Sequence, residues 1–116
     1  MLPVLLATVA TMGFAAAGTP GTILHVITVQ WKADSTPAQR QAAIDGLKKM
    51  AAEVPGIKNI WIKKLKVQPA EYNNVFVLEF ENKAAFETYT NHPAHKAWEK
   101  LYLPIREESN TQDVTN

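Results

Sequence analysis

Two segments of alternating apolar residues constrain the fold of this chain most strongly. Residues 22–32 read TILHVITVQWK and residues 74–81 read NVFVLEFE. Alternation rich in β-branched and aromatic residues is typical of β-strands, whose successive side chains point to opposite faces of a sheet. Valines occupy the second face of both segments, so we expect both faces to be covered. The first face of the earlier segment holds Ile23, His25, Ile27, Val29 and Trp31.

Helical patterns separate and follow these two strands. Thr36 before Pro37 predicts a helix start, and Pro55-Gly56 predicts its end near Val54. Its apolar stripe is expected at Ile44, Leu47, Ala51 and Val54. Residues 57–67, with lysines interleaved, predict another strand. Asn82 is expected to cap a helix over 83–90, and His92-Pro93 separates it from a second stretch over about 94–103.

The resulting order, βαββα, predicts a ferredoxin-like α+β fold with an antiparallel sheet and helices on one face. The polar tail, residues 107–116, gives only a weak signal for a last strand near Asp113. The other sheet face would expose Val26, Val75 and Val77. A second copy of the same sheet covers such a face economically, so we expect a homodimer that forms a dimeric α+β barrel.

Composition narrows the class of protein. The chain has 116 residues, 47% hydrophobic and 20% charged, which fits one globular domain. It has no cysteine, which excludes disulfides, thiolate zinc sites and a cysteine nucleophile. The net charge of +1 gives no reason to expect a nucleic-acid partner.

The first 17 residues, MLPVLLATVATMGFAAA, have the apolar run and small-residue end of a cleavable signal peptide. We expect residues 1–17 to be removed, 18–22 to form a short lead, and 23–116 to form the domain. Export to the periplasm or the extracellular space follows, with no membrane contact after cleavage. A buried N-terminal helix or an uncleaved anchor is the alternative interpretation.

Several polar residues have two interpretations each. His92 and His95 have a spacing that some metal ligands use, but His92 before Pro93 is better placed as a helix cap. Lys58, Lys63 and the lysines after them fit a solvated, protected strand edge better than a phosphate site. Trp31 and Trp61 are assigned to packing or the pocket rim. No Gly-rich phosphate loop, G-x-S-x-G or H-E-x-x-H motif is present, so we expect neither metal nor cofactor.

Four stretches resemble the stress-responsive dimeric α/β-barrel (A/B barrel) domains: HVITVQWK, VPGIKNI, FVLEFENKAAFETY and, most specifically, NHPAHKAW. The resemblance covers roughly residues 24–105. It implies a sheet-to-sheet dimer with a pocket between sheet and helices in each subunit. One branch of the family includes a polyketide cyclase that closes rings without metal or cofactor.

The resemblance to that branch implies catalytic roles for Tyr89 and His95. This chain departs from the branch at Asn74 and Leu47, where the branch has a histidine and a tyrosine. With the strand alternation, it places the pocket between the first helix and the sheet. The expected substrate-binding residues are His25, Ile27, Asn74, Phe76, Leu78 and Trp98.

Two functions of different classes follow. The first is an exported dimer that binds an apolar small molecule without an assigned reaction. The second is a cofactor-free lyase, cyclase or isomerase acting on an apolar carbonyl compound, with Tyr89 and His95 as the acid–base pair. An oxygenase of the same superfamily shape is a third possibility.

Overall fold

The computed structural model describes residues 2–5 and 21–116, so most of the predicted signal peptide lies outside the described residues. From residue 21 onwards the chain alternates strands with helices, in the order predicted from the sequence. The elements are β1 (Ile23–Trp31), α1 (Pro37–Glu53), β2 (Ile57–Trp61), β3 (Asn74–Phe80), α2 (Lys83–Asn91), α3 (Pro93–Tyr102), the 3-10 turn η1 (Leu103–Ile105) and β4 (Arg106–Val114).

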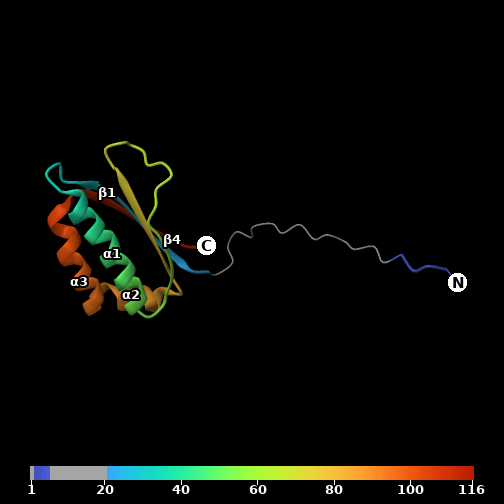
Figure 1. Ribbon diagram of the computed structural model, residues 1–116. Coiled ribbons are helices and arrows are strands. Elements are labelled where there is room, and N and C mark those ends of the chain that lie inside the picture. The colour runs from blue at the N-terminus through green and yellow to red at the C-terminus, as the bar shows by residue number, and fades with distance from the viewer. Residues whose placement is uncertain (1, 6–20) are drawn as a thin grey trace.

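The four strands form one antiparallel sheet in the order β2-β3-β1-β4, with all three helices on the same side (Figure 1). This arrangement confirms the predicted ferredoxin-like α+β fold. Ile27, Val29 and Trp31 of β1 are buried on the helix-covered face, as the alternation predicted. Phe76, Leu78 and Phe80 of β3 are buried beside them.

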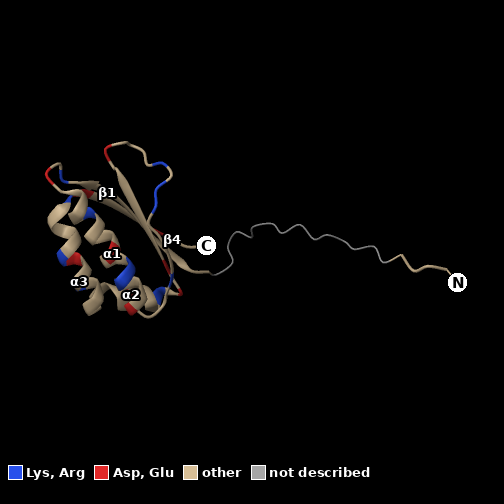
Figure 2. Ribbon diagram, in the orientation of Figure 1, with Lys and Arg blue, Asp and Glu red and all other residues tan. Residues whose placement is uncertain are grey.

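The second strand is shorter than predicted. It ends at Trp61, and the residues after it form a loop before β3. Lys63, Lys64 and Lys66 therefore lie on this loop, where Figure 2 shows basic residues, rather than on a strand. Only Lys58 remains on the sheet edge, so edge protection by a row of lysines is wrong.

Strand β4 is longer than the sequence indicated: it has nine residues, and eight of them pair antiparallel with β1. Its register places Asp113 opposite His25, Thr111 opposite Ile27, and Ser109 opposite Val29. Residues opposite each other in an antiparallel pair point to the same face. The helix-covered side of β4 is therefore polar, which explains why hydrophobic alternation did not reveal the strand.

Helix α1 begins with a capping box. The Thr36 hydroxyl accepts a hydrogen bond from the Gln39 backbone N–H at 3.1 Å, and the Gln39 side chain accepts one from the Thr36 N–H at 2.9 Å. The buried face of the helix is rotated slightly from the predicted stripe, because Ile44 and Ala51 are only partly buried. The fully buried positions are Ala43, Leu47, Met50 and, just after the helix, Val54.

Helix α3 packs closely on α1. The Trp98 indole donates a buried hydrogen bond of 2.9 Å to the Ala43 carbonyl. Gly46 faces the same contact, and a Cβ on it would lie 3.3 Å from the buried Trp98 ring and 2.7 Å from the flexible end of the half-exposed Leu101 side chain. The glycine therefore costs helix propensity of about 1 kcal/mol but permits the approach of the two helices.

The opposite face of the sheet carries Val26, Val75 and Val77, which are only partly covered. Trp61 lies opposite Val77 and is 45% exposed. A single copy of the chain thus leaves apolar side chains on this face in contact with water. Within residues 2–5 and 21–116, no helix combines the length and the apolar character needed to cross a bilayer.

Candidate functional site

A cavity of about 250 Å³ lies between the β1–β4 half of the sheet and helices α2 and α3. Its aromatic and apolar lining comes mainly from β1, α2 and α3, and its polar lining from α3 and β4. The lining residues are His25, Ile27, Phe86, Tyr89, Thr90, His95, Trp98, Glu99, Tyr102, Leu103, Arg106, Ser109 and Thr111.

Five of the eight predicted site residues meet in this cavity: His25, Ile27, Tyr89, His95 and Trp98. The other three do not line it. Phe76 and Leu78 are fully buried in the core, and the Asn74 side chain accepts a hydrogen bond from the Val75 backbone N–H. The sequence predicted the pocket between α1 and the sheet, but the cavity does not lie there. Side chains of α1 join those of β3 in the buried core and fill that space.

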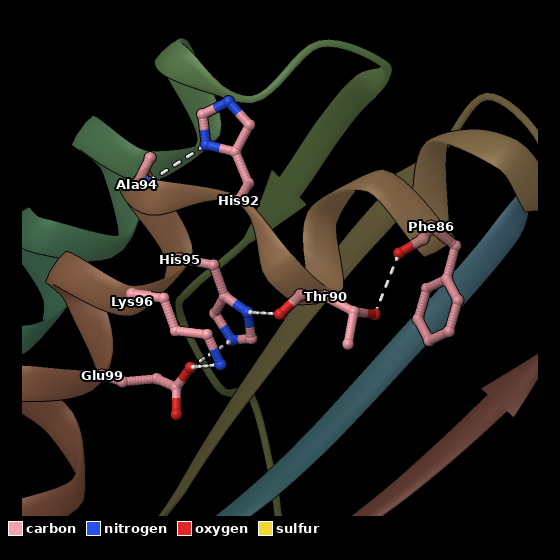
Figure 3. A network of polar contacts seen from close by, with 7 residues as sticks. All are labelled: Phe86, Thr90, His92, Ala94, His95, Lys96 and Glu99. Carbon is pink, nitrogen blue, oxygen red and sulfur yellow. Dashed lines mark hydrogen bonds and ion pairs between the residues drawn. The ribbon is translucent and has the colours of Figure 1, made fainter.

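His95 is held at the junction of α2 and α3. Its Nδ1 lies 3.2 Å from the Thr90 carbonyl, and its Nε2 lies 3.6 Å from Oε1 of Glu99 (Figure 3). In the neutral ring Nδ1–H donates to Thr90, which leaves the Nε2 lone pair facing Glu99. Burial lowers the pKa of His95 below its usual value, and the Thr90 carbonyl and the Glu99 carboxylate oppose that shift. His95 is therefore neutral near pH 7, with a carboxylate ready to stabilise an added proton.

Tyr89 lies against His95. Their rings stack with centroids 4.0 Å apart, and no hydrogen bond joins them. Burial, followed by the negative charge of Glu99, raises the pKa of Tyr89 well above its usual value. The hydroxyl thus stays protonated at neutral pH and can donate a hydrogen bond to a ligand oxygen.

His25 is oriented by a residue from the edge strand. Its Nδ1 contacts Oδ1 of Asp113 at 2.5 Å, and its ring packs edge-on against Phe86 and Tyr89. When Nδ1–H donates to the carboxylate, Nε2 carries the lone pair. The site therefore brings a second imidazole to the ring of Tyr89, at a centroid distance of 5.7 Å.

Two buried polar atoms at this site have no hydrogen-bond partner among the described residues: Oε1 of Glu99 and the hydroxyl of Tyr102. The Lys96 ammonium lies 3.4 Å from the Glu99 oxygen as an ion pair. Unsatisfied buried polar atoms are uncommon in folded proteins and are concentrated where a ligand or water binds. Sequence analysis missed both residues, although the i, i+4 spacing of His95 and Glu99 was visible.

His92 does not join the site. Its Nδ1 accepts a hydrogen bond of 3.0 Å from the Ala94 N–H and caps α3, as the sequence predicted. Figure 3 shows its ring turned away from that of His95. Across the part of the chain that the structure describes, no three His, Asp or Glu side chains gather as a metal site would require.

Fold and site together define a ferredoxin-like α+β domain with a cavity between its sheet and its helices. The family model described as Stress responsive A/B Barrel Domain matches residues 23–116. The chain belongs to this family. No curated protein matches the chain.

Solved structures share the fold at low sequence identity. A dimeric ferredoxin-like protein from Thermobifida fusca is 23% identical, with 84% of this chain and 92% of that chain covered, at a TM-score of 0.73. A hydroxynitrile lyase from Passiflora edulis is 14% identical, with 84% and 95% covered, at 0.72. The cofactor-independent oxygenase SnoaB from Streptomyces nogalater is 16% identical, with 82% and 90% covered, at 0.61.

The lowered pKa of His95 predicts a pH dependence of stability. Below pH ~6.5 an unfolded histidine binds a proton that folded His95 resists, so the unfolded state takes up more protons there. The free energy of unfolding should rise with pH through this window and level off above it, and His95→Gln should reduce the slope. In NMR titration the His95 Cε1–H signal should have a midpoint below 6.5. A midpoint at or above 6.5 contradicts the burial argument.

Proposed function

We propose that this domain binds a small, mainly apolar molecule that carries a carbonyl group, in the cavity between β1, β4, α2 and α3. The observation that carries the proposal is the meeting of Tyr89, His95 and His25 in one aromatic-lined cavity. A protonated phenol and the neutral imidazole of His95 suit a carbonyl oxygen and its neighbouring C–H groups. At about 250 Å³ the cavity is slightly below the ~300–1,000 Å³ of drug-sized sites, so the ligand is small.

Known relatives of the fold support a small-molecule role. A hydroxynitrile lyase and a cofactor-independent oxygenase have this fold, so the same architecture serves enzymes in other proteins. The buried Tyr102 hydroxyl, which has no hydrogen bond of good geometry among the described residues, gives further support, because a ligand could satisfy it.

Binding is tested with a panel of small aromatic and aliphatic ketones and aldehydes, followed by NMR. A bound compound should shift the Cε1–H signals of His25 and His95 and leave that of His92 unchanged, because only the first two line the cavity. Thr111→Trp should block the cavity and remove the shifts. Thr88→Trp, on an exposed part of α2, is the matched control. Shifts that persist in Thr111→Trp contradict this location.

A cofactor-free lyase, cyclase or isomerase is the alternative function, and the neutral state of His95 favours it. Nε2 of His95 would remove a proton beside the carbonyl, and the electron pair of that C–H bond would move towards the carbonyl oxygen. The Tyr89 hydroxyl would hold the developing oxyanion, while Glu99 would stabilise the imidazolium. His25, fixed by Asp113, would orient the substrate.

For a compound that the protein converts, Tyr89→Phe and His95→Gln should each lower kcat by ~10²-fold or more with little change in melting temperature. His92→Asn and Tyr72→Phe are matched controls, since neither residue lines the cavity and Asn can still cap α3. If the site residues only brace the junction of α2 and α3, His95→Gln loses the contact with the Thr90 carbonyl and lowers stability by ~1 kcal/mol, and activity follows the amount of folded protein. That second pattern excludes catalysis by this pair.

We also propose a homodimer through the open sheet face, in keeping with the dimeric description of the Thermobifida fusca protein. Val26, Val75 and Val77 supply the apolar surface. Burying such a surface contributes several kcal/mol at ~25 cal/mol per Å².

Val77→Asp would place an unpaired charge in that interface and should give monomeric or insoluble protein. Ala84→Asp adds the same charge on an exposed position of α2 and should leave the dimer intact. Light scattering measures the mass of each variant. A wild-type monomer at micromolar concentration contradicts the proposed dimer.

Export remains a proposal that rests on the uncharged apolar run of residues 1–17. Protein recovered from the native host should begin near Gly18 in N-terminal sequencing, and should be found in the periplasm or the medium. Intact Met1 in the cytoplasmic fraction contradicts it.

A further inference from the structure

The helix-covered side of β4 is polar throughout. Four residues of β4 lie opposite residues of β1 whose side chains face the helices, so they point to the same face. They are Arg106, Ser109, Thr111 and Asp113, opposite Trp31, Val29, Ile27 and His25. Positions of this kind are normally apolar, because they pack against helices. Here the first three line the cavity instead. The strand thus supplies hydrogen-bonding groups to a space that the helices leave open.

One end of this polar strip carries an unsatisfied donor. Tyr102 is 3% exposed, lines the cavity, and its hydroxyl has no hydrogen bond of good geometry with the described residues. Burial raises the pKa of Tyr102, and the Arg106 and Ser109 side chains lie near enough to its hydroxyl to oppose that rise. The Arg106 guanidinium carbon lies 5.5 Å from the centre of the Tyr102 ring. Ser109 lines the same end. A phenol, a hydroxyl and a guanidinium therefore converge there without a shared acceptor.

Arg106 is also without an acidic partner. It makes no ion pair with any residue that the structure describes, and the carboxylates nearest the cavity are engaged elsewhere, Asp113 with His25 and Glu99 with Lys96 and His95. A guanidinium is charged at all working pH values, and a partly buried one is costly without an anion. Planar carboxylates match its paired N–H donors.

We propose that the cavity takes a carboxylate-bearing ligand, with the carboxylate held by Arg106, Tyr102 and Ser109 at the β4 end. The apolar body of the ligand lies along Ile27 and Trp98 towards Tyr89 and His95. A single carboxylate is favoured over a phosphate dianion because, among the described residues, Arg106 is the only Lys or Arg that lines the cavity, and the acidic Glu99 lines it too. This inference rests on the proposed use of the cavity as a ligand site and adds the ligand's chemical class.

The test compares an acid with its neutral isostere at pH 7, using the full chain. The probes are 3-phenylpropanoate against 3-phenylpropanamide, and hexanoate against hexanamide, with Kd measured from NMR shifts of the cavity residues. Each acid should bind ~10-fold or more tightly than its amide. Arg106→Gln should remove this preference, Arg106→Lys should keep part of it, and Tyr102→Phe should weaken acid binding several-fold.

Arg40→Gln is the matched control, because Arg40 is also partly buried but bonds to Ser35 away from the cavity. Equal binding of acid and amide by the wild-type chain overturns the carboxylate site and leaves the proposed ligand cavity standing. If neither probe pair shifts any NMR signal, and the ketones and aldehydes cause no shifts either, both the carboxylate site and the ligand cavity are overturned. Tighter binding of phenylphosphonate than of the acids overturns the choice of carboxylate. The acid–amide comparison needs no variant, so it holds even if Arg106→Gln fails to fold.

Discussion

The docking of α3 on α1 through Trp98 is the contact on which the site depends. The indole reaches the Ala43 carbonyl, and Gly46 leaves the room that this approach requires. The same ring stacks on Tyr102 with centroids 4.4 Å apart. Because His95 and Glu99 lie on the first two turns of α3, the position of this helix sets where the imidazole and the carboxylate stand relative to the sheet.

The cavity arises from a contrast within the sheet. β1 and β3 turn mainly apolar side chains to the helices, and these join residues of α1 and α3 in one buried core. β4 turns serine, threonine and arginine to the same side. Burying those groups under an apolar helix face would cost free energy for each hydrogen bond lost to water. The structure leaves a hollow there, and the polar strip and the aromatic helix residues face each other across it.

Sequence reasoning succeeded where hydrophobic pattern and tertiary structure agree. Alternation predicted the helix-facing sides of β1 and β3, and Asn82 predicted the start of α2. It failed for β4 because a strand that lines a hollow has no apolar period. Alternation also predicts which face of the sheet a side chain occupies, but not whether that side chain packs in the core or lines a cavity. For this reason Phe76 and Leu78 were expected in the pocket. Asp113 could be paired with His25 only through the strand register.

The register of the last strand therefore completes the site. His25 on β1 gains its orienting carboxylate only when β4 pairs with β1, and a slip of one residue would turn Asp113 to the opposite face. The same slip would withdraw Thr111 and Ser109 from the cavity. Tyr89 stands between the two imidazoles, in contact with His25 from the sheet and with His95 from α3. The arrangement of these side chains thus requires both the docking of α3 on α1 and the pairing of β4 with β1, which lie on opposite sides of the cavity.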